Sequence, residues 1–424
     1  MNSRYQPWLL AGLIAATACD RPADTETGAR LPDGVPFLER DSSGVLVATT
    51  LGTRARAPAG WVVDTVPEFQ LGEMEGDDPY LFSRIEGVQQ FSDGRVMVLD
   101  RANCELRFFG ADGVFLEQKG GRGEGPGEFQ PNYSCDLEPS PGNDSVYVHS
   151  GSVWPSVSLF DDHGRFSRRV RVSWVGRRLP RVYGVAGGRF LGLDRSLPLF
   201  NENPAARTAG MAPEPGMAYY ALFDLDTGVP VWEEAFQGAH EYRIMPNSVY
   251  DLPFDILPAA ILGRDRLFLT LGENQGPEIL EYDLSGNLRR IIRLAEEVVT
   301  PSRDDIEKLV EFRLAPWDMT PEDREHFTEV QLGDYAEMPL PEIMPVFSRL
   351  LVDDVGWLWA ELYRFDVRAP KTWLVFDPNG EGHGSVDMPP DLDVRQVGRD
   401  FVLGVWLDEL EVEYVHRHAL IGRE

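Results

Sequence analysis

Basic residues are scarce in this sequence. Its 424 residues include 40 Lys and Arg against 69 Asp and Glu, which gives a formal net charge of −29. A charge of this size repels nucleic-acid phosphates and anionic lipid headgroups wherever salt does not screen it. Nucleic acid is therefore not expected as a partner, and the acidity is best explained by a repulsive surface that keeps the protein in solution.

Motifs of common catalytic sites are also lacking. The chain has no Gly-x-Ser-x-Gly elbow, no phosphate-binding loop that ends in Lys-Ser or Lys-Thr, and no His-Glu-x-x-His helix. The stretch GGRGEGPGEF lies between predicted strands rather than before a helix, and its Glu124 and Glu128 would repel phosphate. No catalytic residue is predicted, and whether the protein is an enzyme stays open, with the balance towards a binding protein.

Metal ligands are few as well. His416 and His418 lie two apart on a predicted strand, hence on one face, but no third ligand is evident, and a chance pair on a solvated strand is the preferred explanation. Asp161, Asp162 and His163 occupy a predicted turn of a kind that can bind calcium, yet aspartate recurs at equivalent turns, which indicates turn geometry. We predict no metal and no cofactor; calcium stays open without a supporting motif.

The apolar run near the N-terminus is too short to span a bilayer. It extends from Trp8 to Ala16, follows a polar start that contains Arg4, and leads into small residues before Cys19. These small residues resemble the bacterial lipobox, in which the peptide is cut before the cysteine and its thiol is lipidated, although Ala16 stands where that motif usually has Leu. An ordinary secretory peptide cut near Ala18 is the alternative.

This N-terminal pattern predicts export. Residues 1–18 are expected to be a signal peptide, and Cys19 is expected to carry the lipid in the cell envelope or periplasm. The polar stretch 19–40, with scattered Pro and Gly, is expected to be a flexible tether to a folded domain over 41–424. The lipid anchor would be the only contact with a membrane.

Two cysteines remain after Cys19. An oxidising compartment permits Cys104 and Cys135 to form a disulfide. Two buried free thiols are the alternative, since spacing in a sequence does not establish geometry.

A repeat organises the rest of the chain. A turn followed by a short apolar strand occurs six times, and an aromatic-Asp strand end followed by a Gly turn occurs five times. The first pattern begins at Ser92, Gly142, Gly187, Gly263, Asp354 and Gly398; the second ends at Gly113, Gly164, Gly228, Gly286 and Gly380. Each unit thus holds four antiparallel strands, which is a propeller blade, and the chain is predicted to be an all-β, six-bladed β-propeller.

The sixth unit lacks its last strand. The chain ends after one further alternating segment, VEYVHRHAL, so that blade would leave an open sheet edge. The sequence from Pro67 places an outer strand before an acidic, Gly-containing loop that ends in an aromatic residue, as the sequence from Leu116 does. Residues 67–71 are therefore predicted to complete blade six and close the ring.

One unit resembles a known repeat. The stretch from Gly87 to Phe129, with SDG, VMVLD, Asn103, LRFFGADG and GRGEGPGEF, is similar to an NHL repeat. The other units keep the turns but lose the Asn and the Gly-rich loop, so they resemble the wider group of six-bladed, TolB-like propellers in pattern. The resemblance implies the six-bladed fold and bacterial relatives of uncharacterised function.

Surplus residues are concentrated in three insertions. These are Arg195 to Met217, Gly238 to Asp255 and Ala295 to Val346. In a propeller whose strands run alternately up and down, all three would emerge on one face, which we call the insertion face. Function in rigid scaffolds concentrates on loops, so this face is the expected binding surface; long loops without a role are the alternative.

Two helices are predicted within the insertion at about 300 to 340, between blades four and five. Ser302 begins a sequence like a capping box, and Thr320 followed by Pro321 begins the second helix. Apolar residues at helical spacing follow the first start: Ile306, Leu309, Val310 and Leu314. The pair is expected to be a cap packed on its own domain, and a lid or docking patch over the mouth is the alternative.

The candidate binding residues are polar and aromatic residues at the ends of second strands and in the insertions. They are Asn103, Arg122, Arg195, His240, Tyr242, Arg243, Glu361, Tyr363, Arg364 and Asp408. Arginine and tyrosine at these positions could recognise an anionic or carbohydrate-like ligand against an otherwise acidic protein.

The expected function is an exported, lipid-anchored propeller that binds a small ligand or an envelope protein through the insertion face. The alternative is an extracytoplasmic hydrolase, lactonase or lyase, because related propellers have metal or carboxylate sites at the central channel. A scaffold whose helices dock a partner is a third interpretation. Converging histidines and carboxylates at the channel mouth would favour an enzyme, and an apolar or Arg/Tyr-lined mouth would favour binding.

Overall fold

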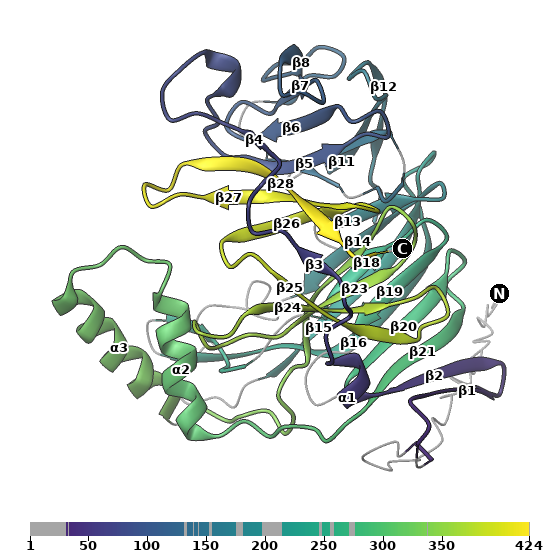
Figure 1. The fold of residues 1–424 in the computed structure, drawn as a ribbon, viewed down its shortest axis with the longest axis vertical. Coiled ribbons are helices and arrows are strands. Elements are labelled where there is room, and N and C mark those ends of the chain that lie inside the picture. The colour runs from purple at the N-terminus through teal and green to yellow at the C-terminus, as the bar shows by residue number, and fades with distance from the viewer. Residues whose placement is uncertain are drawn as a thin grey trace, which may run out of the picture.

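The computed structural model describes most of the chain from Leu31 to Arg423 (Figure 1). The described residues are 31–32, 34–130, 134–138, 140–142, 144–151, 155–174, 181–196, 214–245, 248–254, 258–270, 276–336 and 338–423. For 181, 195–196, 214–217, 237–245 and 248–251 the backbone alone is described.

Six sheets of at least four strands surround a central axis, so the fold is the predicted six-bladed β-propeller. From the axis outwards, blade one holds β5 (Ile85–Gln90), β6 (Val96–Asp100), β7 (Glu105–Phe109) and β8 (Phe115–Gly120), and blade two holds β9 (Cys135–Leu137), β10 (Val146–Ser150), β11 (Ser156–Phe160) and β12 (Phe166–Arg171). Blade three holds β13 (Arg181–Ala186), β14 (Arg189–Ser196), β15 (Glu214–Asp224) and β16 (Pro230–Met245), and blade four holds β18 (Ala260–Leu262), β19 (Arg266–Thr270), β20 (Glu278–Asp283) and β21 (Leu288–Ala295). Blade five holds β22 (Phe347–Val352), β23 (Leu358–Leu362), β24 (Lys371–Phe376) and β25 (Gly382–Met388), and blade six holds β26 (Leu392–Val397), β27 (Phe401–Leu407), β28 (Glu413–Ile421) and β4 (Phe69–Leu71).

The second strand of a blade is short and mostly apolar because it is buried. Every residue of β6 and of β10 is buried, because each blade packs between two neighbours and both faces of its sheet are covered. Aspartates close the hairpins that follow. Asp283 Oδ1 accepts the backbone N–H of Ser285 at 2.8 Å and of Asn287 at 3.0 Å. Gly286 in the same turn has φ 82°, which glycine adopts without strain.

An N-terminal strand closes the ring, as predicted. β4 pairs antiparallel with β28 through Leu71 opposite Val415 and Gln70 opposite His416. A second short strand, β3 (Val62–Val63), pairs with the end of β28. The strand that the sixth repeat lacks is therefore supplied from more than 300 residues earlier in the chain.

Blade four carries two strands that the repeat did not predict. β1 (Phe37–Ser42) and β2 (Val45–Leu51) form a hairpin, and β2 pairs parallel with β21. A short helix, α1 (Gly52–Ala55), follows at the edge of this sheet. β1 begins within the stretch 19–40 that was assigned to the tether, so the described fold already includes Phe37.

The insertion predicted from Gly238 to Asp255 is largely strand. β16 continues to Met245 and pairs with β17 (Ser248–Asp251). Its last part, with Leu252 and Phe254 buried, packs against the helices described next. The insertion thus lengthens blade three instead of forming a free loop.

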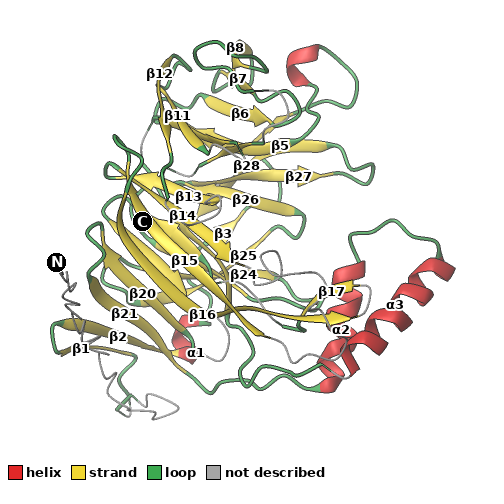
Figure 2. Ribbon diagram, turned by 180° about the vertical axis from the view of Figure 1, so that it is seen from behind, coloured by secondary structure: helices red, strands yellow, loops and turns green. Residues whose placement is uncertain are grey.

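The helical insertion lies where it was predicted. α2 (Arg303–Leu314) begins at Ser302 with a capping box, and α3 (Pro321–Ala336) follows. The buried residues of α2 pack with Leu252, Phe254, Tyr335 and Phe365. Figure 2 shows α2, α3 and β17 together at one side of the ring, with β1 and β2 at the other side. A separate 3-10 turn, η1 (Asp78–Tyr80), follows β4.

Candidate functional site

A cavity of about 90 Å³ lies along the central channel of the propeller. The inner strands of blades one, two, four, five and six line it, and its walls include Val88, Leu137, Ile261 and Leu351. Inner strands enter from the insertion face, so the first residues of each strand lie at that end of the cavity. Polar side chains occupy both ends and apolar side chains lie between them.

Two arginines share one carboxylate at the insertion-face end. Arg349 Nη1 lies 2.8 Å from Asp393 Oδ1, and Arg395 Nη2 lies 2.8 Å from Asp393 Oδ2. Burial of Asp393 opposes its ionisation, but the two guanidinium groups prevail and lower its pKa. Arg349 also lies over the ring of Trp373 at 5.9 Å, which fixes its position between blades five and six.

β-bulges aim two charged side chains at this end. The pairing of β5 with β6 shifts at Glu86, and the pairing of β26 with β27 shifts at Arg395. A bulged residue leaves the alternation of the strand, so its side chain can be directed differently from its neighbours. Both residues line the cavity, and Arg395 Nη1 donates to the Glu86 carbonyl oxygen at 3.1 Å.

A second ion-pair network continues this end of the cavity towards blade two. Arg101 Nη1 lies 2.7 Å from Glu86 Oε2 and 3.6 Å from Asp136 Oδ1, and Asp136 Oδ2 lies 3.8 Å from His149 Nδ1. Burial raises the pKa of Glu86, with Arg101 acting in the opposite direction. Arg101 thus lies between a carboxylate of blade one and a carboxylate of blade two.

Three half-buried charged residues of blade five adjoin the two arginines. Burial raises the pKa of Glu361, and its carboxylate has no direct hydrogen bond or ion pair among the described residues. Burial lowers the pKa of Lys371, whose Nζ donates to the Leu392 carbonyl at 3.1 Å. Arg364 lies over the ring of Phe312 from α2, at 5.1 Å. The helical insertion thus contacts the group directly.

The opposite end of the cavity holds Asp354. Its carboxylate accepts hydrogen bonds from Gln396 Nε2 at 3.0 Å and from the Gly142 backbone N–H at 3.4 Å. Burial raises the pKa of Asp354 to about 6. A carboxyl group with a pKa near neutrality in a channel is a common property of functional sites.

Glu361, Tyr363 and Arg364 are the predicted residues that the structure brings together. They lie at the end of β23 and in the connection after it, where Tyr363 and Phe365 pack on the helical insertion. Four others, Arg195, His240, Tyr242 and Arg243, lie where side chains are outside the described part. Cys19 also lies outside the described residues.

The remaining three predicted residues do not line the cavity. Asn103 is exposed in the β6–β7 turn. Arg122 Nη2 donates to the Arg101 carbonyl at 3.2 Å, which ties the Gly-rich loop to that turn. Asp408 Oδ1 accepts the backbone N–H of Leu410 at 2.8 Å and closes the β27–β28 turn.

The prediction missed Glu86, Arg349, Lys371, Asp393 and Arg395. The candidate binding residues were taken from the ends of second strands and from the insertions, whereas most of the missed residues lie on inner strands. A charged residue in an inner strand was an available signal, because both faces of such a strand are covered by neighbouring blades.

His416 and His418 lie in the closed seam of blade six and not on a solvated strand as expected. Both are buried. His416 Nε2 lies 3.1 Å from Gln70 Oε1 of β4, and His418 Nδ1 lies 2.8 Å from the Asp64 carbonyl oxygen. Burial, together with the charge of His418, lowers the pKa of His416 to about 4. The expectation of solvent exposure was wrong because the N-terminal strands cover this edge.

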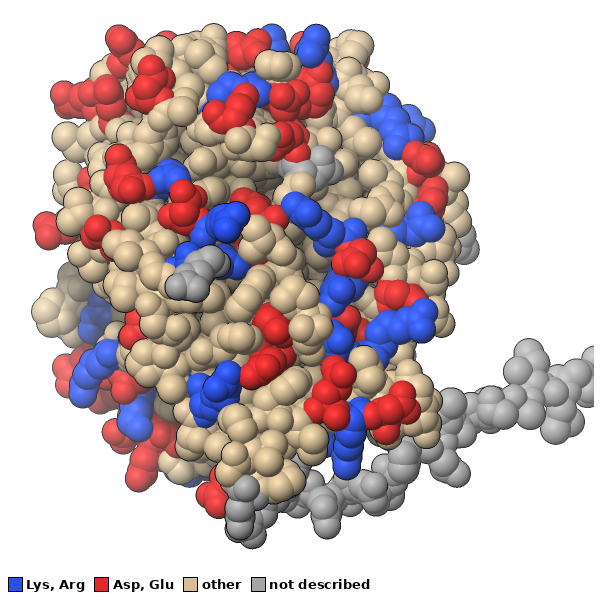
Figure 3. Space-filling view, turned by 45° about the vertical axis from the view of Figure 1, so that its right-hand side comes forward, with Lys and Arg blue, Asp and Glu red and all other residues tan. Residues whose placement is uncertain are grey.

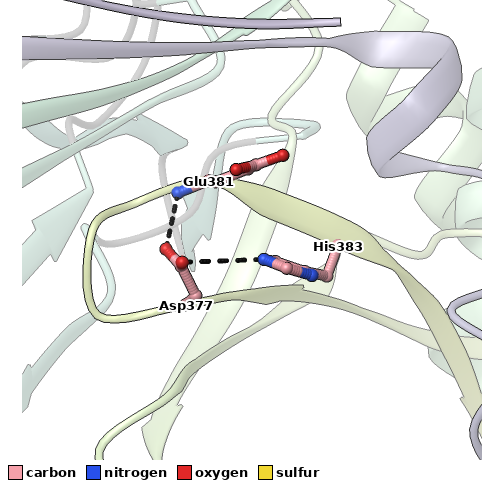
Figure 4. A group of neighbouring side chains, drawn as sticks. All are labelled: Asp377, Glu381 and His383. Atoms are coloured by element: carbon pink, nitrogen blue, oxygen red, sulfur yellow. Dashed lines mark hydrogen bonds and ion pairs between the residues drawn. The ribbon is translucent and has the colours of Figure 1, made fainter.

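One group of three side chains with metal-ligating atoms lies close together among the described residues: Asp377, Glu381 and His383 (Figure 4). It sits at the outer β24–β25 turn, where Asp377 Oδ1 accepts the Glu381 backbone N–H at 2.9 Å. Glu381 is paired with Arg54 at 2.8 Å, and His383 lies against the ring of Trp357. The group is thus engaged in the same kind of aspartate turn that closes other blades.

Cys104 and Cys135 are joined in a disulfide with Cα atoms 5.9 Å apart. The bond links the β6–β7 turn of blade one to the inner strand of blade two. It holds the wall of the channel near Glu86 and Asp136.

The surface shows no separation of charge on the face seen in Figure 3, where basic and acidic side chains are interspersed. None of the helices in the described residues is long and apolar enough to cross a membrane.

Comparisons with known proteins find likeness in solved structures only. No protein-family model matches the chain, and no curated protein matches it. A Bacteroides fragilis protein assigned to export is 12% identical, with a TM-score of 0.44, over 88% of this chain and 99% of that one. A DUF4221 family member from Bacteroides vulgatus is 11% identical, with a TM-score of 0.46, over 85% and 98%. Virginiamycin B lyase from Staphylococcus aureus is 10% identical, with a TM-score of 0.35, over 85% and 100%. Each likeness is one of fold.

Proposed function

We propose that this chain is an exported, lipid-anchored propeller that binds a ligand at the insertion-face mouth of its central channel. The observation that carries the proposal is the pair Arg349 and Arg395, held by Asp393 at the end of the cavity. Arginine forks recognise a ligand through charge-assisted hydrogen bonds. By contrast, the metal-type group found among the described residues lies at an outer turn of blade five.

The anchor is supported by the sequence before the fold. The apolar run that ends before Cys19 is followed by a polar stretch, and the first described strand begins at Phe37. A tether of that length would hold the ring close to the membrane. The likeness of blade one to an NHL repeat supports kinship with NHL and TolB-like propellers. We include no metal cofactor and no nucleic acid in the proposal.

Binding and catalysis are distinguished by what the purified protein contains and does. Native mass spectrometry of the protein purified from its own cells should show a small molecule or a partner at a 1:1 ratio, released chemically unchanged. Leu137→Trp should abolish this uptake, because the larger side chain fills the cavity. Leu116→Trp, at an exposed position of β8, is the matched control. Stoichiometric calcium or zinc together with turnover of the bound molecule would show an enzyme instead.

The anchor has its own test. Full-length protein produced in a bacterial host should fractionate with membranes and take up a labelled fatty acid, whereas Cys19→Ser should do neither. Labelling that persists in the Cys19→Ser variant would place the lipid elsewhere.

A further inference from the structure

The shape of the central cavity limits its occupant to a small molecule or a small group. About 90 Å³ gives room for on the order of six water-sized groups. Its walls are mainly apolar and include Val88, Ile261 and Leu351, with Gln89 and Glu138 among the other lining residues. A ligand that fills this space is expected to have an apolar body of a few carbon atoms, because a polar group placed against an apolar wall would find no hydrogen-bond partner there.

Charge at the insertion-face end favours an anion. The seam between blades five and six brings together four cations and three carboxylates: Arg349, Arg364, Lys371 and Arg395 with Glu361, Asp391 and Asp393. This local excess of positive charge stands within a chain whose net charge is −29. An anionic group would be attracted to this seam and repelled by most of the remaining surface.

Arg395 also has a donor without an acceptor. Its Nε is buried and has no hydrogen-bond partner among the described residues, while its Nη atoms are engaged by Asp393 and by the Glu86 carbonyl. A buried donor that lacks an acceptor destabilises the protein until one is supplied. The bulge of β26 turns this side chain to the cavity wall, so a ligand in the cavity can supply the acceptor.

We propose that the cavity binds a small organic carboxylate, with its head group between Arg395 and Arg349 and its short apolar body against Val88 and Leu351. This inference rests on the proposed binding function and names the class of ligand. A carboxylate fits because its two oxygens accept charge-assisted hydrogen bonds from guanidinium groups. The far end of the cavity holds Asp354, so the body of the ligand ends without a second negative charge.

Three probes with one apolar body separate the head groups: 4-methylpentanoate, its neutral amide and 4-methylpentylammonium. Isothermal titration calorimetry of the folded, full ring at pH 7.5 should show the carboxylate binding at least tenfold more tightly than the amide, with no binding of the ammonium. An amide that binds as tightly as the carboxylate, or an ammonium that binds more tightly, would overturn the assignment of the ligand class.

Variants locate the head group. Arg395→Gln should weaken binding of 4-methylpentanoate about tenfold or more and remove its preference over the amide, and Arg395→Lys should recover part of the affinity. Arg293→Gln is the matched control: its side chain is also about one quarter exposed and paired with a carboxylate, but on the outer strand of blade four. Thermal unfolding of each variant shows whether the ring is intact.

The experiments distinguish a wrong ligand class from a wrong binding function. If Arg395→Gln binds the carboxylate as wild type does, the head-group site is wrong although binding stands. If none of the three probes binds wild type at 20 mM, the carboxylate class is wrong, while the 1:1 complex sought by native mass spectrometry still decides whether the channel binds a ligand at all.

Discussion

Asp354 is the residue whose ionisation opposes folding most clearly. Its pKa is raised to about 6 by burial, from an unfolded value near 4. Between these pH values the folded state binds the proton and the unfolded state does not, so stability falls as pH rises through this window. Above pH 6 the folded protein holds a buried charge that costs up to about 3 kcal/mol.

Replacement of Asp354 by Asn should stabilise the protein at neutral pH. Asp354→Asn keeps an oxygen for the Gly142 N–H and removes the charge, and we expect a gain of about 1–2 kcal/mol at pH 7 that vanishes near pH 4. Urea unfolding at both pH values measures it. Asp283→Asn is the opposing control, since Asn287, Ser285 and Arg289 lower the pKa of Asp283 despite its burial penalty. That variant should lose stability at pH 7; a gain there would contradict this account.

His416 acts with the opposite sign on acidification. Burial and the charge of His418 lower its pKa to about 4, below the unfolded value of about 6.5. As pH falls between these values, the unfolded state takes up the proton first and the folded state loses stability. The loss is about 3 kcal/mol at most for this residue.

Replacement of His416 by Gln should flatten the acid side of the stability profile. His416→Gln retains a hydrogen-bonding side chain towards Gln70, so the expected change is a smaller loss of unfolding free energy between pH 7 and pH 4.5. His326→Gln, on the exposed surface of α3, should leave the profile unchanged. Equal slopes for wild type and His416→Gln would show that the seam does not govern acid stability.

The closing strand β4 is the element on which the ring depends. Leu71 is 2% exposed and packs with Val415, Leu403 and Phe109, which come from blades six and one. Three residues of strand therefore join the two ends of the repeat array. Their contribution comes from burial rather than from the number of backbone hydrogen bonds.

Truncation of Leu71 should open this seam. Leu71→Ala should cost about 2–5 kcal/mol of unfolding free energy, and hydrogen exchange should accelerate first in β28. Leu116→Ala, on the outer strand of blade one and 51% exposed, should change stability by less than about 0.5 kcal/mol. Uniform exchange across all blades in the Leu71 variant would contradict closure by β4.

Local pattern predicted the hairpins and the closing strand β4, but not the pairing of β2 with blade four or the full length of β16. Aspartate turns and apolar runs mark β6, β10 and β19 in the sequence, because their geometry depends on adjacent residues. β2 pairs parallel with β21, and nothing in the sequence next to β2 predicts this pairing. The extension of β16 to Met245 likewise depends on β15 and β17 as partners. β2 lies in the predicted folded domain but was assigned to no blade, and the end of β16 was expected to be part of an insertion.

At the scale of the whole molecule, net charge is the dominant feature. A charge of −29 repels itself across the folded ring and less so in the expanded chain. Basic side chains are interspersed among acidic ones on the face seen in Figure 3. Because acidic residues outnumber basic ones, salt bridges offset only part of the repulsion.

Added salt should therefore stabilise the protein. Raising NaCl from 20 to 200 mM at pH 7.5 shortens the screening length to below 10 Å, and Tm should rise by several degrees. At about pH 4.5, where carboxylates are partly protonated, the same salt step should have little effect. A fall in Tm at pH 7.5 would show that attractive pairs outweigh the repulsion.

The sequence by itself determined the number of blades, the strand borrowed for closure and the place of the two helices. These follow from turn chemistry, strand periodicity and capping, which act between neighbours in the chain. Only the tertiary structure decided the site: Arg349, Asp393 and Arg395 come from two blades, and Glu86 from a third. Their meeting depends on blade packing and on the bulges of β5 and β26, which are set by contacts between residues far apart in the chain.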